Sequence, residues 1–142
     1  MTDALDDATL WTLFNLAALP SGDWTHAAHL RTAWLFLRGH ALDDAHLLMR
    51  VGIIKLNAAH GLVETSSRGY HETMTRVWLA LVSAAQRQGP VLADSREFLR
   101  THKELLGKDA PLRHYSRELL FSVAARARFV APDLAPLPVS DV

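Results

Sequence analysis

The sequence contains no cysteine, which excludes a disulfide framework, a thiolate metal site and a cysteine nucleophile. It also lacks any apolar run near the roughly 18 residues that a membrane span needs. The longest candidate, residues 78–85, is far too short. The opening residues, Met1 to Asp7, are acidic and lack the apolar core of a signal peptide. These absences predict a cytoplasmic protein with no membrane partner.

The chain also lacks a net charge, because 15 basic residues balance 15 acidic residues. A nucleic-acid-binding protein needs a dominant basic field, so we predict no nucleic-acid partner. A chain of 142 residues that is 49% hydrophobic is long enough for one core. We predict a single helical domain over residues 1–130, followed by a proline-rich C-terminal tail over residues 131–142.

Apolar residues recur with helical periodicity, and no segment has the alternation of a strand. The predicted helices, separated by glycine- or proline-containing breaks, cover residues 7–19, 24–38, 43–60, 70–88, 95–106 and 116–129. The predicted fold is therefore all-α, a compact single-domain helical bundle of about five to six helices with antiparallel neighbours. Gly52 lies inside the third helix, where a close contact with another helix would explain it.

Apolar stripes mark the expected inner faces of these helices. The third helix carries Leu47, Leu48, Val51, Ile54 and Ala58. The last helix is expected to turn inward Leu119, Leu120, Val123, Ala127 and Val130.

Histidine is abundant, with eight residues in the chain. His26 and His29 are three residues apart at the start of the second helix, so they share a face. The positive end of the helix dipole disfavours imidazolium there. A neutral imidazole is the form that ligates metals or acts as a general base.

A second motif, His71-Glu72, opens the fourth helix. If the second and fourth helices run parallel, their starts meet at one end of the bundle. His26, His29 and His71 would then form an open metal site for zinc, iron or nickel, with Glu72 as the catalytic base or as a partner of a ligand. Without metal, the same residues could serve as acid–base groups.

Three further residues are predicted to shape a ligand pocket: Trp24, Tyr70 and Arg76. Each has a structural alternative. Trp24 could be a hydrophobic staple at the helix entry, and Arg76 could form an intrahelical ion pair with Glu72, four residues earlier. The histidines could simply bond backbone carbonyls, the role favoured for His40, His46, His60, His102 and His114 unless they face solvent.

The chain resembles a family of small, uncharacterised bacterial helical proteins. The resemblance lies in Trp24-Thr25-His26-x-Ala28-His29-Leu30 with Ala33-Trp34, and in Gly69-Tyr70-His71-Glu72-Thr73-x-Thr75. It continues through Tyr115-Ser116 to the closing segment 129–138, so it covers most of the chain. It implies membership of that family and brings no activity with it.

The leading functional prediction is a small helical enzyme with hydrolytic or oxidative chemistry on an unidentified small molecule. Its cofactor would be a divalent transition metal (zinc, iron or nickel) or none. Two alternatives stay open: a non-catalytic ligand-binding or regulatory module, and a structural protein whose apolar helix face is completed in a homodimer.

Overall fold

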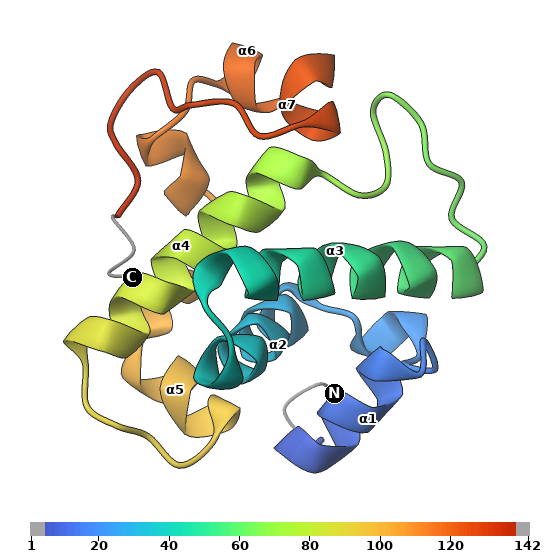
Figure 1. Ribbon diagram of the computed structural model, residues 1–142, viewed down its shortest axis with the longest axis vertical. Helices are drawn as coiled ribbons and strands as arrows, with labels where there is room; N and C mark the ends of the chain where they lie inside the picture. The colour runs from blue at the N-terminus through green and yellow to red at the C-terminus, as the bar shows by residue number, and fades with distance from the viewer. Residues whose placement is uncertain (1–4, 139–142) are drawn as a thin grey trace.

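The computed structural model describes residues 5–138, and every regular element among them is helical, as the periodicity predicts. The first four and the last four residues, which belong to the predicted domain and tail, lie outside the described residues. Three helices form the centre of the fold: α2 (His26–Gly39), α3 (Leu42–Ala59) and α4 (Glu72–Gln88). They contact one another, α2 also packs against α5 (Ser95–Thr101), and α4 also contacts α7 (Val123–Ala127). Figure 1 shows α3 crossing the front of the molecule, over α2 and α4.

The α-helices are α1 (Asp7–Asn15), α2 (His26–Gly39), α3 (Leu42–Ala59), α4 (Glu72–Gln88), α5 (Ser95–Thr101), α6 (Arg117–Leu120) and α7 (Val123–Ala127). Short 3-10 helices connect them: η2 (Ser21–Asp23), η3 (Lys103–Leu106) and η4 (Ala110–Arg113). None of the helices within residues 5–138 has the length and hydropathy required to cross a membrane.

Short polar side chains fix where the helices begin. Asp6 accepts a hydrogen bond from the Thr9 amide and caps α1. The cap of α2 is Thr25, which accepts from the Ala28 amide. Each cap satisfies an amide that the first helical turn would otherwise leave unpaired.

Gly52 is explained by the approach of α1 to α3. A Cβ atom at Gly52 would lie only 2.3 Å from the ring of Phe14. That ring is 1% exposed and has little room to move. The predicted close contact at Gly52 is therefore confirmed, and it lets α1 pack directly on α3.

A buried arginine ties three helices together. Arg31 of α2 has no exposed surface. Its guanidinium donates to the Ser95 hydroxyl on α5 at 2.6 Å and pairs with Asp7 of α1 at 3.2 Å. Asp7 also accepts from the Ser95 amide at 2.9 Å. This network satisfies a charge that would be costly to bury alone.

The structure corrects several helix boundaries. The first helix ends at Asn15 rather than residue 19, and the fifth ends at Thr101 rather than residue 106. Two further corrections concern the fourth and the last helix. The fourth helix begins at Glu72 rather than Tyr70, because His71 is its N-cap. The predicted helix over 116–129 is two short helices, since Ser122 caps a new helix at Val123 by accepting from the Ala125 amide. A serine that bonds the backbone locally competes with a continuous helix. Val123, predicted to face inward, is consequently 62% exposed.

The third helix also faces differently from its apolar stripe. Leu47, Val51 and Ile54 are 51%, 42% and 41% exposed. The buried face instead carries Met49, Ile53 and other residues, namely Leu42, Ala45, His46, Leu56 and Asn57. Apolar residues lie on both sides of α3, so the stripe in the sequence did not identify the side that packs.

The described part of the tail lies against the helices. Leu137 packs on the small apolar cluster that contains Val77 and Tyr115. The Ser116 amide donates to Asp133 at 2.8 Å, and the Leu134 amide donates to the His114 carbonyl at 2.9 Å. Residues 131–138 therefore cover α4 and α6 without forming a helix.

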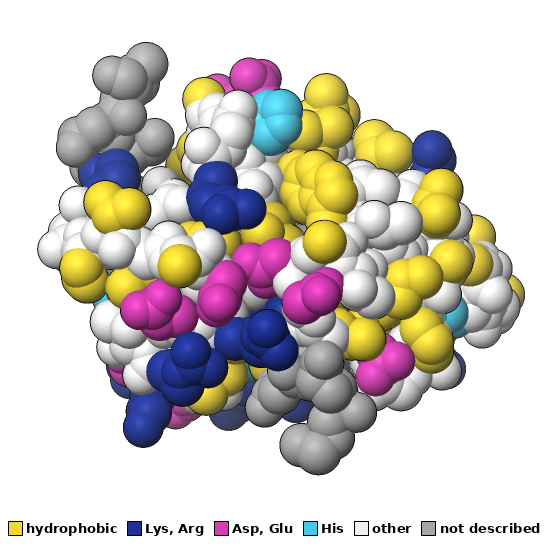
Figure 2. All heavy atoms as spheres, turned by 90° about the horizontal axis from the view of Figure 1, so that it is seen from below, with side chains coloured by type: hydrophobic (Ala, Val, Ile, Leu, Met, Phe, Trp, Pro, Cys, Tyr) yellow, Lys and Arg dark blue, Asp and Glu magenta, His cyan; other side chains and the backbone are white. Residues whose placement is uncertain are grey.

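Figure 2 views the molecule from below, where basic and acidic side chains are interspersed on one half of the face and apolar ones are spread over the other. On this face, neither sign of charge dominates, which agrees with the balanced composition.

Candidate functional site

A cavity of about 340 Å³ lies between α2, α3 and α4. It is within the size range of small-molecule sites, near the lower end. Its lining residues are His26, His29, Ala33, Met49, Ile53, Gly69, Tyr70, His71, Met74, Thr75, Trp78, Leu79 and Lys108. The starts of α2 and α4 thus do line one cavity, and three predicted histidines and Tyr70 come together there.

His26 and His29 each commit one ring nitrogen to a backbone carbonyl. His26 Nε2 donates to the Leu105 carbonyl at 3.0 Å, and His29 Nδ1 donates to the Thr25 carbonyl at 2.8 Å. These bonds place a proton on the committed nitrogen, so the other nitrogen of each neutral ring carries a lone pair. Within residues 5–138, no group hydrogen-bonds that second nitrogen in either ring.

The surroundings keep both rings neutral. Burial lowers the pKa of His29 to about 4, more than the Thr25 carbonyl can offset. Although the ring keeps some exposure because it lines the cavity, Trp24 stacks on it with centroids 3.7 Å apart. Burial also lowers the pKa of His26, and the charge of Lys108 adds to the effect. The cavity therefore offers hydrogen-bond acceptors rather than imidazolium cations at neutral pH.

Trp24 reaches the cavity only indirectly. It is absent from the lining, but its ring stacks on His29, and it also lies against the Phe14 ring at a centroid distance of 5.3 Å. The contact with Phe14 joins the entry of α2 to α1. Trp24 is therefore a packing residue at the entry of α2, which was the alternative to the predicted pocket wall.

His71 differs from the other two histidines because both its nitrogens are used. Nδ1 accepts from the Met74 amide at 3.0 Å, which caps α4. Nε2 must then carry the proton, and it donates to the Leu120 carbonyl at 2.7 Å. Burial lowers the pKa of His71. The His71 ring lines the cavity, but neither of its nitrogens has a lone pair available to a ligand or a metal.

These hydrogen bonds do not fit the predicted three-histidine metal centre. A catalytic zinc site uses three protein ligands, whereas here only His26 and His29 have an uncommitted nitrogen. Across residues 5–138, no three histidine, aspartate or glutamate side chains are grouped so that they could hold a metal ion. The expectation of zinc, iron or nickel at His26, His29 and His71 therefore gains no support from the described residues.

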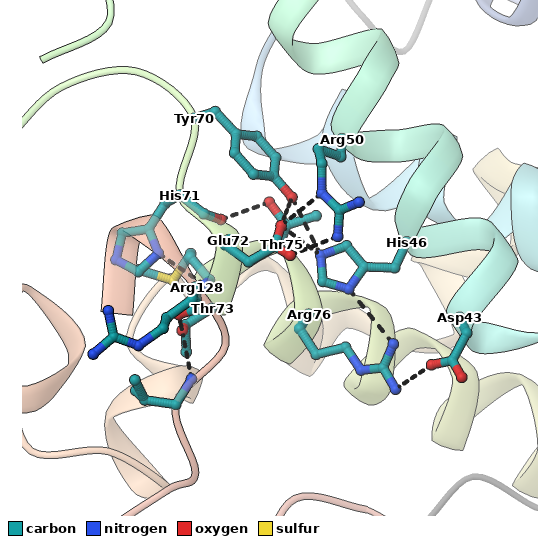
Figure 3. Close-up of polar contacts among 12 residues, drawn as sticks. Asp43, His46, Arg50, Tyr70, His71, Glu72, Thr73, Thr75, Arg76 and Arg128 are labelled. Carbon is teal, nitrogen blue, oxygen red and sulfur yellow. Dashed lines mark hydrogen bonds and ion pairs between the residues drawn. The ribbon is translucent and has the colours of Figure 1, made fainter. Parts of the chain in front are cut away.

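Glu72, the predicted catalytic base, lies outside the cavity in a charged cluster (Figure 3). Arg50 of α3 binds its two carboxylate oxygens at 2.9 and 2.5 Å. The Tyr70 hydroxyl donates to the same carboxylate at 2.6 Å. Burial alone would raise the pKa of Glu72, but the hydrogen bonds from Arg50 and Tyr70 outweigh it and hold the pKa below its usual value. A carboxylate so fully paired is a poor proton acceptor.

Arg76, predicted to shape the pocket, belongs to the same cluster. It pairs with Asp43 of α3 at 2.7 Å and donates toward His46 Nδ1 at 3.5 Å. Arg76 and Glu72 do not form the alternative ion pair with each other, because both side chains bind partners on α3 instead. Figure 3 shows these contacts joining α3 to the start of α4.

Sequence reasoning missed the partners of this cluster, although a signal exists. Asp43, His46 and Arg50 follow one another at spacings of three and four, which is one face of a helix. Glu72 and Arg76 are four residues apart, so they also share a helix face. Two polar helix faces of complementary charge could have been paired. Lys108, by contrast, lies in a loop whose position no periodicity predicts.

The loop between α3 and α4 forms one wall of the cavity, and two charged residues hold it. Arg126 of α7 donates to the carbonyls of Ser67, Gly69 and Tyr70 at 3.2, 3.1 and 3.3 Å. Glu64 accepts from the Tyr70 amide at 2.7 Å. At Gly69, φ is +106° and a Cβ would lie 2.3 Å from the Glu64 carboxylate, so glycine is required there.

Comparison with models of protein families, with curated proteins and with solved structures gave no match in any of the three. The function is therefore inferred from the geometry of the cavity.

Proposed function

We propose that this protein binds a small, largely apolar carboxylate that also carries an N–H or O–H donor, in the cavity between α2, α3 and α4. The observation that carries the proposal is the pair of neutral imidazoles, His26 and His29, each with one nitrogen fixed and one free. A ligand N–H or O–H would donate to these lone pairs.

The remaining walls support the other features of the ligand. Met49, Ile53, Met74 and Trp78 provide apolar and aromatic surface, and thioethers adapt to flat rings. Lys108 is exposed, lines the cavity and is the one cation among its lining residues. Its ammonium would attract a carboxylate at the mouth.

Binding without catalysis is favoured over the hydrolytic or oxidative enzyme. A general base works best with a pKa near the working pH, whereas the pKa of His29 is about 4. Glu72 is held in the charged cluster, and His71 has both nitrogens bonded. The proposal adopts the binding or regulatory module that the sequence left open, in the cytoplasm as the cysteine-free composition suggests.

The test is a thermal-shift and ligand-observed NMR screen with small aromatic acids that carry a ring N–H or a hydroxyl, alongside their methyl esters. Ala33→Met extends into the cavity, since Ala33 lines it. Ala27→Met on the same helix is the matched control, because Ala27 lines a different cavity. Acids that stabilise the wild type and Ala27→Met but not Ala33→Met support the proposal. It is overturned if no acid binds, or if Ala33→Met binds equally well.

Metal content separates this proposal from the metalloenzyme. Elemental analysis of untagged protein, grown in metal-replete medium and purified without chelators, is expected to give far less than one metal ion per chain. Stoichiometric zinc, iron or nickel that disappears in His26→Ala would contradict the proposal and restore the metal site.

A further inference from the structure

The outer face of α3 is an apolar surface that no described element covers. Leu47, Val51 and Ile54 are each between 41% and 51% exposed. Their spacing of four and three residues places them in one line along the helix. Ala58 continues the line and is also exposed. We refer to Leu47, Val51, Ile54 and Ala58 as the outer stripe.

Charged residues of opposite sign adjoin the stripe, one before Leu47 and one next to Ile54. Asp44 lies in the first turn of α3 and is exposed. Lys55 lies eleven positions later, three turns along the same face, and is also exposed. The neighbouring Asp43 is partly neutralised, because it pairs with Arg76. The face therefore runs from acidic through apolar to basic.

We propose that the outer stripe is the interface between two copies of this chain, with their α3 helices antiparallel about a two-fold axis. In the register that sets Asp44 of each copy against Lys55 of the other, Leu47 of each copy lies beside Val51 of the other at the two-fold axis. A two-fold interface needs a self-complementary surface, which this charge order provides. A parallel pair would instead place Asp44 against Asp44 and align the helix dipoles unfavourably.

The dimer is expected to be weak. One helix face contributes the contact, which places it at the small end of specific interfaces. The dissociation constant should then be on the order of micromolar or higher. The interface is independent of the proposed ligand, because Met49 and Ile53 reach the cavity from the opposite side of α3.

Sedimentation velocity from about 1 µM to about 1 mM tests the association. The wild type should change from monomer to dimer across this range, and Val51→Glu should raise the dissociation constant at least ten-fold. Val123→Glu is the matched control, since Val123 is 62% exposed on α7, and it should dimerise like the wild type. A wild type that stays monomeric, or a dimer unaffected by Val51→Glu, overturns the proposal.

A charge exchange tests the antiparallel orientation. Asp44→Lys and Lys55→Asp should each weaken the dimer several-fold at low salt, and the double variant should restore it. Both substitutions lie on the exposed surface, so the fold should tolerate them. A double variant no better than the single variants overturns the antiparallel interface.

The absence of cysteine allows a direct check of proximity. Val51→Cys should be linked into covalent dimers by a short bis-maleimide, whereas Val123→Cys should not. Equal linking of the two variants overturns the proposal, because it would indicate random collision.

Discussion

Residues 70–72 are consecutive, yet they contribute to two regions that differ in how completely their polar groups are paired. In the cavity, His26 and His29 each keep one free ring nitrogen. In the charged cluster next to it, Arg50 and other neighbours occupy both oxygens of Glu72. A fully paired cluster stabilises the fold, whereas unpaired acceptors lining a cavity are suited to binding.

The largest expected effect is a loss of stability when the charged cluster loses its carboxylate. Glu72→Ala leaves Arg50 and the half-buried Tyr70 hydroxyl without their carboxylate, and should lower the free energy of unfolding by about 3 kcal/mol. Urea denaturation measures it. Glu118→Ala, at an exposed acid, should change the stability by less than about 0.5 kcal/mol. Equal losses in the two variants would show that the cluster does not stabilise the fold.

A smaller effect is expected at the cavity when the pH falls. The pKa of His29 is about 4 in the folded chain, against 6.5 for an unperturbed histidine, so the unfolded chain binds the extra proton first. The contribution of neutral His29 to the free energy of unfolding is then fully present above pH 6.5 and declines toward pH 4, by about 2 kcal/mol between pH 7 and pH 5. Denaturation at several pH values measures the decline.

The variant His29→Phe keeps an aromatic ring against Trp24 but cannot be protonated. It should flatten the stability profile between pH 7 and pH 5. An unchanged slope would mean that His29 is not the group that titrates. Burial lowers the pKa of His26 and His71 as well, so a residual slope of the same sign should persist.

A third effect concerns ligand affinity. Lys108→Met should weaken binding of a carboxylate found in the screen by about five-fold, or roughly 1 kcal/mol, and leave its methyl ester unaffected. Lys103→Met is the matched control, because Lys103 lies outside this cavity. Calorimetry measures both. Equal losses for acid and ester would show that Lys108 does not recognise the charge.

The smallest effect is expected in the loop that walls the cavity. Arg126→Met removes three hydrogen bonds to loop carbonyls, and should speed hydrogen exchange of the Thr65 and Tyr70 amides several-fold. Global stability should fall by about 1 kcal/mol or less, since the loop is largely exposed. Arg113→Met, at an exposed arginine, should leave these amides unchanged.

Local chemistry made much of the fold predictable. The breaks at Pro20, Gly61 and Gly89-Pro90 and the cap at Asp6 are encoded within a few residues. The prediction that the starts of α2 and α4 lie together was also within reach, because a single helix joins them. The prediction of one continuous last helix was wrong, because the Ser122 side chain caps a new helix at Val123.

By itself, the sequence determined the helical class, most of the helix positions, and the residues His26, His29, Tyr70 and His71 that line the cavity. The tertiary structure alone decided what their polar atoms do. The Leu105 and Leu120 carbonyls that bond His26 and His71 are 79 and 49 residues away. No local pattern records such a contact, yet it sets which ring nitrogen is free, and therefore whether a histidine can bind a ligand or only hold the fold.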